Sequence, residues 1–272
     1  MNNVIYHYCN IDSFKAIIQN KTLWLSSIYN LNDYKEIHWI KDKVANRIKE
    51  LTTKHNFKKY ELFEEMYLVQ HPLVYVASFS QGQDLLSQWR AYANDGKGIA
   101  IGFNSEYFDY ASNIKISKVL YSEEEQNRQI EEILDSIENL DNSIIKTDFN
   151  CFKKICQETI TKINNLAAKS KSELFKEEQE VRVIHNPIIT NDRENSCYRF
   201  ENSISNMKFR TCHDNIIPYF ELKFDKNKDN ISPIVEIIKG PKNRAIDKEI
   251  RMFMSINGFH DMKIKKSNAS YR

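Results

Sequence analysis

The sequence predicts an α+β protein with a mainly antiparallel sheet, flanking helices and a long helical-pair insertion. Short runs rich in β-branched and aromatic residues alternate irregularly with helical patterns along all 272 residues. Several connections between the predicted strands are too short to hold a crossover helix, which argues against a doubly wound parallel sheet. Residues 122–170 contain neither glycine nor proline, and two long helices are expected there.

A chain of this length can bury a large core without disulfides or metals. Because no Pro/Gly-rich linker separates the segments, we predict one α+β domain over residues 1–272, with residues 122–170 as a helical insertion within it.

The first strand is expected over residues 4–8, which are mostly β-branched or aromatic. The period of two along a strand places His7 on the face opposite Tyr6 and Tyr8. A helix over residues 13–20 follows, because its apolar residues recur at helical spacing.

The remaining elements follow from the same two periodicities. Asp84 suits the cap of a short helix, and residues 187–206 are polar enough to predict a loop. Further helices are expected over residues 34–55, 60–70, 123–140, 149–166 and 246–257. Further strands are expected over residues 22–26, 73–79, 99–103, 114–121, 178–185, 208–211, 219–224, 234–238 and 262–264.

Composition limits the function classes. Lys+Arg 39 against Asp+Glu 37 gives a net charge of +2, so there is no overall attraction to nucleic acid or membrane, although Lys239, Lys242 and residues 263–266 form local basic clusters. The five cysteines include no C-x-x-C pair, which argues against a disulfide framework or a zinc site. Reduced thiols and the lack of a signal peptide or spanning segment predict a cytoplasmic protein that makes no membrane contact.

His7, Ser26 and Ser27 are the first candidate site residues, because they lie on two early strands that we expect to be close together. Each also has an ordinary explanation. A single histidine on a strand is more often packed than catalytic, and serines at a strand end commonly bond their own turn.

Asn32 and Asp33 follow the second strand and are also candidates. Both residue types favour tight turns because they hydrogen-bond to their own backbone. Asp33 could equally cap the helix that follows, with Glu36 three residues later as its capping-box partner.

Glu178, Glu180 and Arg182 share one face if their segment is a strand. One interpretation is an outward charged ladder on an edge strand. The other is a carboxylate kept ionised by a guanidinium, which could stabilise positive charge on a sugar carbon as a glycosidic bond breaks, or accept a proton from an attacking hydroxyl.

Several enzyme classes lack their motifs in this sequence. There is no Ser-His-Asp order with a nucleophile elbow, no H-E-x-x-H helix and no dinucleotide glycine fingerprint. The Gly96-Lys97-Gly98 run lacks the spacing of a phosphate-binding loop.

Taken together, these motifs resemble a large bacterial family of unknown function. The resemblance covers nearly the whole chain. It rests on Tyr6-His7-Tyr8, Leu31-Asn32-Asp33, Phe79-Ser80, Trp89-x-x-Tyr92-Ala93, Gly98-x-x-x-Gly102-Phe103, Glu178-x-Glu180-x-Arg182 and Tyr271-Arg272.

Three short motifs are also similar to those of the ADP-ribosyltransferase fold, which implies a split antiparallel sheet. By this resemblance His7 would bind the ribose hydroxyls of NAD, and Ser26 or Ser27 would steady the nicotinamide ribose. Glu180 would be the catalytic carboxylate, and Glu178 the acidic residue that precedes it. Tyr6 and Tyr8 would contact the substrate, together with Asn32, Asp33 and Arg182.

The resemblance implies NAD-dependent ADP-ribosyl transfer or NAD hydrolysis, with NAD as substrate and no metal. The acceptor would be a nucleic acid or a protein, a regulatory partner protein is conceivable, and the role would suit a bacterial toxin or phage-defence effector. Two alternatives stay open. One is a non-catalytic nucleotide- or protein-binding module. The other is a metal-dependent nuclease in which Asp33, Glu36, Glu178 and Glu180 gather a cation.

Overall fold

A computed structural model describes residues 3–30, 35–55, 57–69, 73–108, 113–192, 197–212, 214–225 and 231–269. The chain forms two compact units. We name them the sheet unit (Met1–Ser26, Tyr75–Lys118 and Lys176–Arg272) and the helical unit (Ser27–Val74 and Val119–Phe175). Each unit is therefore assembled from segments that are distant in sequence.

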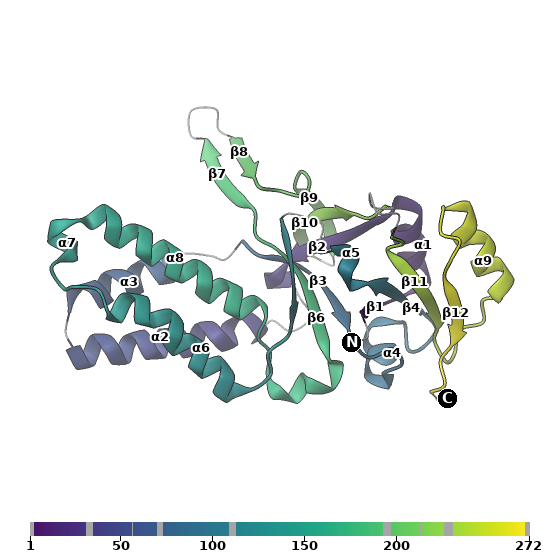
Figure 1. Cartoon of the computed structure of the whole chain (residues 1–272), viewed down its shortest axis with the longest axis horizontal. Coiled ribbons are helices and arrows are strands. Elements are labelled where there is room, and N and C mark those ends of the chain that lie inside the picture. The colour runs from purple at the N-terminus through teal and green to yellow at the C-terminus, as the bar shows by residue number, and fades with distance from the viewer. Residues whose placement is uncertain are drawn as a thin grey trace. The chain divides into compact units, whose positions relative to one another are not determined.

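The sheet unit is built on a ten-stranded sheet in the order β12-β11-β4-β1-β3-β2-β10-β9, with β6 pairing with β3 and β5 with β6. The pairings are mainly antiparallel, and β11 with β12 is a parallel pair. The expectation of a mainly antiparallel sheet with flanking helices is confirmed (Figure 1). The strands are β1 (Val4–Cys9), β2 (Thr22–Ser27), β3 (Tyr75–Ser80), β4 (Ile99–Asn104), β5 (Ile114–Lys118), β6 (Glu180–His185), β9 (Lys208–Cys212), β10 (Asn215–Lys223), β11 (Ile234–Lys239) and β12 (Lys263–Lys266).

One face of this sheet carries the main hydrophobic core, and we name it the core face. Alternate residues of the strands supply it, among them Ile5, Phe79, Ile101, Val181 and Phe220, all buried. We name the opposite side the polar face. A smaller hydrophobic cluster covers part of the polar face and consists of Tyr6, Tyr8, Trp89, Ala93, Ala100 and Ile238. The flanking helices are α1 (Ile11–Asn20), α4 (Leu86–Tyr92), α5 (Ser105–Phe108) and α9 (Asp247–Ile256).

Helix α4 packs on the polar face over β1 and β4. Trp89 is fully buried there, and its ring meets the edge of Tyr8 at a centroid distance of 4.7 Å. Asp84 does not cap this helix as predicted. Its carboxylate accepts hydrogen bonds from the Trp89 indole (2.6 Å) and from the backbone N–H of Asn268 (2.8 Å), so it ties the C-terminal segment to α4.

The predicted loop over residues 187–206 is wrong. It contains a two-stranded hairpin, β7 (Ile188–Asp192) with β8 (Cys197–Glu201), which projects from the sheet in Figure 1. The hairpin forms a sheet of its own, and its strands mix apolar with polar and charged residues, so they lack the apolar run by which buried strands are recognised in a sequence.

The helical unit packs its long helices around a second hydrophobic core. In α2, Ile40, Val44 and Ile48 recur at helical spacing, and all three are fully buried. The helices expected within residues 122–170 pack against α2 and α3 in this core. The helical segments are α2 (Lys35–His55), α3 (Lys58–Val69), α6 (Glu123–Glu138), α7 (Ile144–Thr147) and α8 (Phe149–Ala168), with short 3₁₀ turns η1 (Ile28–Asn30) and η2 (Glu173–Glu178).

Among the residues described, no helix combines the length and apolar character needed to cross a membrane.

Candidate functional site

A row of polar residues crosses the polar face of the sheet. Glu180 on β6 pairs with Ser80 on β3, Ser80 with Tyr6 on β1, Tyr6 with Gly102 on β4, and Gly102 with Glu236 on β11. Residues that pair directly across neighbouring strands project to the same face. The sheet therefore brings two acidic residues, a serine and a tyrosine from four distant segments into one line.

One end of the row is a short hydrogen bond. The Tyr6 hydroxyl donates to Glu236 Oε1 at 2.6 Å, and Lys265 forms an ion pair with the other carboxylate oxygen at 2.6 Å. Gly102 leaves room for the Glu236 side chain, because a Cβ at this position would lie 2.7 Å from Glu236 Cγ. Burial raises the pKa of Tyr6, and the hydrogen bond to the carboxylate raises it further. The Tyr6 hydroxyl therefore keeps its proton and donates it in the hydrogen bond to Glu236.

At the other end, Arg182 holds Glu180 in a bidentate ion pair. Arg182 Nε donates to Glu180 Oε1 at 2.8 Å and Nη2 to Oε2 at 3.0 Å. Arg182 is 1% exposed and Glu180 7%. Both carboxylate oxygens face the planar guanidinium, the geometry in which a charged hydrogen bond is strongest. Glu180 is therefore well oriented, but both of its carboxylate oxygens are occupied, so it is poorly available as a proton acceptor.

Glu178 lies outside β6, so the predicted Glu178–Glu180–Arg182 ladder along one strand is wrong. Glu178 ends the 3₁₀ turn η2, and Gln179 adopts a left-handed conformation (φ +48°) before β6 begins. Ser80 fixes the turn, since its hydroxyl donates to the Glu178 carbonyl at 2.6 Å. The turn interrupts the alternation that the sequence pattern implies.

His7 lies on the core face, opposite Tyr6 and Tyr8 as predicted. Its ring centroid is 5.6 Å from that of Phe79, and its Nδ1 lies 3.0 Å from the carbonyl oxygen of Ser78. Burial lowers the pKa of His7, which favours the neutral imidazole. Glu180 projects from the other face of the same sheet. The structure therefore does not bring His7 and Glu180 together as the ADP-ribosyltransferase resemblance requires.

Of the two candidate serines, Ser26 shares the polar face with Glu180. Ser26 pairs with Tyr219 on β10, and it alternates with Leu25, which is buried in the main core. Ser27 follows on the core side and is itself buried. Asn32 and Asp33 lie outside the described residues.

An aromatic pair, exposed Trp24 and buried Tyr219, lies next to Ser26. The rings of Trp24 and Tyr219 are tilted to each other by 31° at a centroid distance of 4.5 Å, and Trp24 is 47% exposed. Lys208 and Arg210 on β9 project to the same side, because they pair with Tyr219 and Ile217. We name Trp24, Ser26, Lys208, Arg210 and Tyr219 the aromatic patch.

Arg210 gives this patch an unsatisfied donor. Its Nη2 reaches Ser26 Oγ at a long 3.5 Å, and its Nε is buried with no hydrogen-bond partner among the described residues. Lys208, in contrast, is paired with Glu221 at 2.8 Å. A buried donor without a partner costs free energy, which an anionic ligand would recover.

The sequence analysis missed the aromatic patch. The signal available in the sequence was the position of Trp24 between Leu23 and Leu25, because alternation along a strand places it on the face opposite to both leucines. Its partners Tyr219 and Arg210 are nearly 200 residues away, and only strand pairing joins them.

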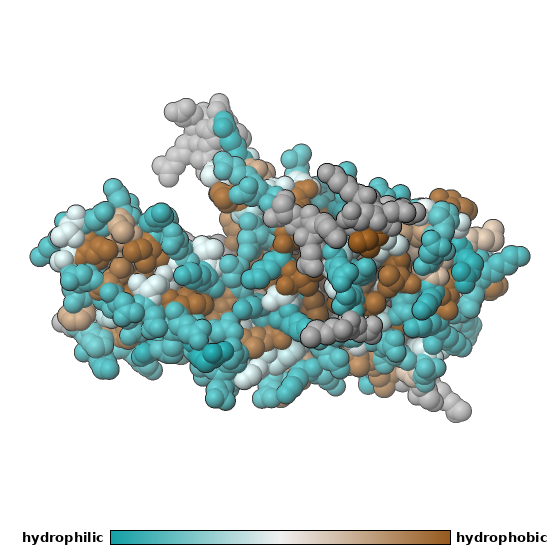
Figure 2. All heavy atoms as spheres, viewed as in Figure 1, coloured by the Kyte–Doolittle hydropathy of each residue, from teal (hydrophilic) through white to brown (hydrophobic). Residues whose placement is uncertain are grey.

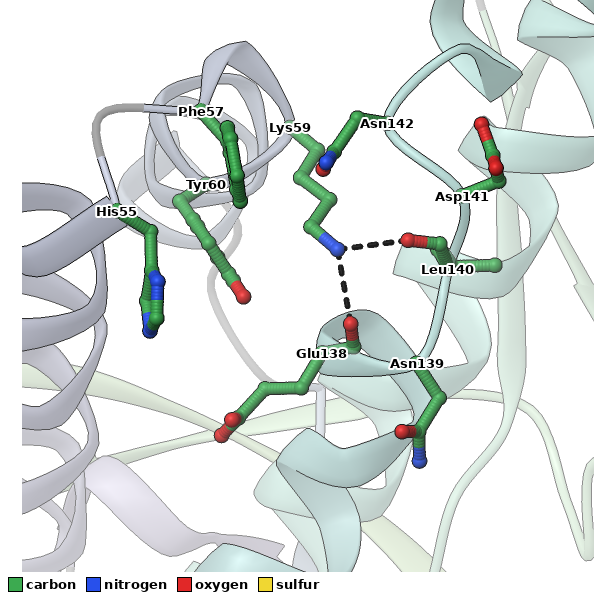
Figure 3. A pocket seen from close by; sticks show the side chains of 9 residues that line it. All are labelled: His55, Phe57, Lys59, Tyr60, Glu138, Asn139, Leu140, Asp141 and Asn142. Carbon is green, nitrogen blue, oxygen red and sulfur yellow. Dashed lines mark hydrogen bonds between the residues drawn. The ribbon is translucent and has the colours of Figure 1, made fainter.

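The helical unit carries a separate open pocket of about 510 Å³, shown in Figure 3. Lys59 is 3% exposed, and its ammonium donates to the carbonyl oxygens of Glu138 (2.8 Å) and Leu140 (2.7 Å) at the end of α6. Burial lowers the pKa of Lys59. Because these carbonyls are otherwise unsatisfied helix-terminal groups, Lys59 is explained by stability alone.

Within the described ranges, no group of three or more His, Cys, Asp or Glu residues is placed to hold a metal ion. Of the four carboxylates of the nuclease alternative, Asp33 and the side chain of Glu36 lie outside the described residues, and the turn at Gln179 lies between Glu178 and Glu180.

The fold and this face define a mixed α/β protein with an open, mainly antiparallel sheet and a polar site face. Residues 88–183 match the model of the family DUF2971, described as a protein of unknown function, and the resemblance to a family of unknown function is confirmed over this stretch. Trp89, Glu180 and Arg182 lie within it. No curated protein and no solved structure was found to match the chain.

Proposed function

We propose that the chain is a nucleotide-binding protein whose site is the polar face, with NAD as the first ligand to test. The observation that supports this most is the aromatic patch. A half-exposed indole beside a second ring offers a stacking surface for a base, and the positively charged guanidinium of Arg210 on the same side favours a phosphate.

A binding module is favoured over the ADP-ribosyltransferase by two features of the sheet. Both oxygens of Glu180 are held by Arg182, whereas stabilising an oxocarbenium-like sugar requires a carboxylate that faces the substrate. His7, the expected ribose ligand, projects from the core face. The transferase or NAD glycohydrolase stays a prediction with its own test.

Binding is tested by calorimetry with NAD, ADP-ribose and ATP on the whole chain. Trp24→Ala removes the exposed ring and is expected to weaken binding by about 1–3 kcal/mol, roughly 5- to 150-fold in Kd. Phe209→Ala is the matched control, because Phe209 is exposed on the same strand as Arg210 but projects to the opposite face. Absence of binding by the wild type, or equal losses in both variants, contradicts the proposal.

Catalysis is tested by following nicotinamide release from NAD in the wild type and in Glu180→Gln. Release that disappears in a folded Glu180→Gln protein supports the transferase or glycohydrolase. NAD that binds and is not consumed supports the binding module. Activity that appears only with divalent metal and added nucleic acid supports the nuclease.

A further inference from the structure

The positive charge of the chain is concentrated at one edge of the sheet. Residues 234–269, which form β11, α9 and β12, contain eight Lys or Arg against four Asp or Glu, whereas the rest of the chain contains 31 against 33. The sheet order places β12 at one edge and β9, with the aromatic patch, at the other. The two regions are therefore separate surfaces.

Five of these eight cations are exposed and form no ion pair with any described residue. Lys239, Lys242 and Lys265 are instead paired with Asp247, Asp95 and Glu236. The five that remain are Arg244, Lys248, Arg251, Lys263 and Lys266, and we name them the edge cations.

The edge cations come from three neighbouring segments. Arg244 lies in the turn before α9, Lys248 and Arg251 lie on the exposed side of α9, and Lys263 and Lys266 lie on β12. Strand β11 pairs with β12 in parallel, and α9 is the crossover between them. Lys263 pairs with Glu236 and so lies on the polar face, whereas Lys266 pairs with Lys239 and lies on the side of α9. The cations therefore surround one βαβ unit at the sheet edge, where Figure 2 shows hydrophilic and hydrophobic side chains mixed.

We propose that the edge cations bind the phosphate backbone of a nucleic acid. Unpaired cations on adjacent segments repel one another, and a polyanion removes that repulsion while releasing its own counterions. An anionic membrane is the less suitable partner. Helix α9 turns Ile250 and Met254 into the core, and its exposed large apolar side chains are Met252 and Ile256, one turn apart. Two such residues form a narrower apolar face than that of a helix which inserts into a membrane surface.

The test compares two variants of equal net charge. One replaces the five edge cations with Gln. The control replaces five exposed lysines of the helical unit with Gln, namely Lys49, Lys54, Lys146, Lys154 and Lys162, which likewise form no ion pair with described residues. Both variants have the same net charge, so any effect of overall charge is the same in each. Thermal unfolding confirms that both are folded.

Binding of a labelled 20-base-pair duplex and of a single-stranded RNA is measured at 50–200 mM salt. The edge variant is expected to lose at least about tenfold in affinity and to show a shallower salt dependence. The change in the slope of log K against log[salt] is up to about 4.5 for five duplex contacts. The control is expected to stay within about twofold. Equal losses in the two variants, no wild-type binding at 50 mM salt, or binding to anionic vesicles without binding to nucleic acid would each overturn the proposal.

Discussion

Replacing Arg182 with Met tests whether the Glu180–Arg182 pair is one structural unit. The substitution keeps a long apolar side chain in the core but removes both hydrogen bonds to the Glu180 carboxylate. Glu180 then remains buried without its charged partner. Breaking a buried ion pair in this way costs about 3–5 kcal/mol, because the carboxylate stays desolvated after it has lost its guanidinium partner.

This loss of stability is large enough to measure both as a change in Tm and as a change in the free energy of unfolding. For a chain of this size 1 kcal/mol shifts Tm by about 2–4 °C, so Tm is expected to fall by about 6–20 °C. The double variant Glu180→Leu/Arg182→Met removes both charges and replaces them with apolar groups. It is expected to be more stable than Arg182→Met alone, by at least about 2 kcal/mol.

Urea unfolding followed by circular dichroism gives the free energy of unfolding of the wild type, the single variant and the double variant. A single variant that loses less than about 1 kcal/mol would refute the reasoning. So would a double variant no more stable than the single one.

Three further predictions follow from other buried groups. Because burial lowers the pKa of His7 and His185, the unfolded chain binds more protons below about pH 6.5, and the free energy of unfolding is expected to fall as the pH is lowered from 7 to 5. Gly102→Ala places a Cβ against Glu236 and is expected to cost about 1–3 kcal/mol in urea unfolding. Lys59→Met leaves the carbonyls at the end of α6 without a donor and is expected to cost about 1–3 kcal/mol in the same assay.

Each of these three has a control. Replacing His7 and His185 with Gln should flatten the pH dependence, and a dependence unchanged in that variant assigns it to other groups. For Gly102, the variant Glu236→Ala should relieve the clash with the added Cβ. Lys58→Met alters an exposed neighbour of Lys59, and a loss as large as that of Lys59→Met would contradict the capping role.

Strands that are buried on both faces could be predicted from their residues alone. Residues 99–103 are an example, because the side chains on both faces of this strand are apolar or small, so the strand is recognised without knowing which face meets the core. The opposite orientations of His7 and Tyr6 also followed from alternation within one strand.

The arrangement of the site could not be predicted, because it depends on pairing between distant strands. Alternation fixes which residues of β1 share a face, but only the pairing of Tyr6 with Ser80 and of Ser80 with Glu180 shows that Glu180 joins Tyr6 and not His7. The left-handed conformation of Gln179 keeps Glu178 out of strand β6. No residue type in that segment signals this conformation, since glutamine rarely adopts it.

The two-segment construction of the helical unit has a consequence during synthesis. Helices α2 and α3 are complete at Val69, whereas α8, which completes their core, begins only at Phe149. At a translation rate of about 5–20 residues per second, these helices wait roughly 4–16 s on the ribosome with apolar stripes uncovered. The nascent chain therefore passes through a period in which it is a substrate for chaperones, and slowing translation between α3 and α8 lengthens that exposure.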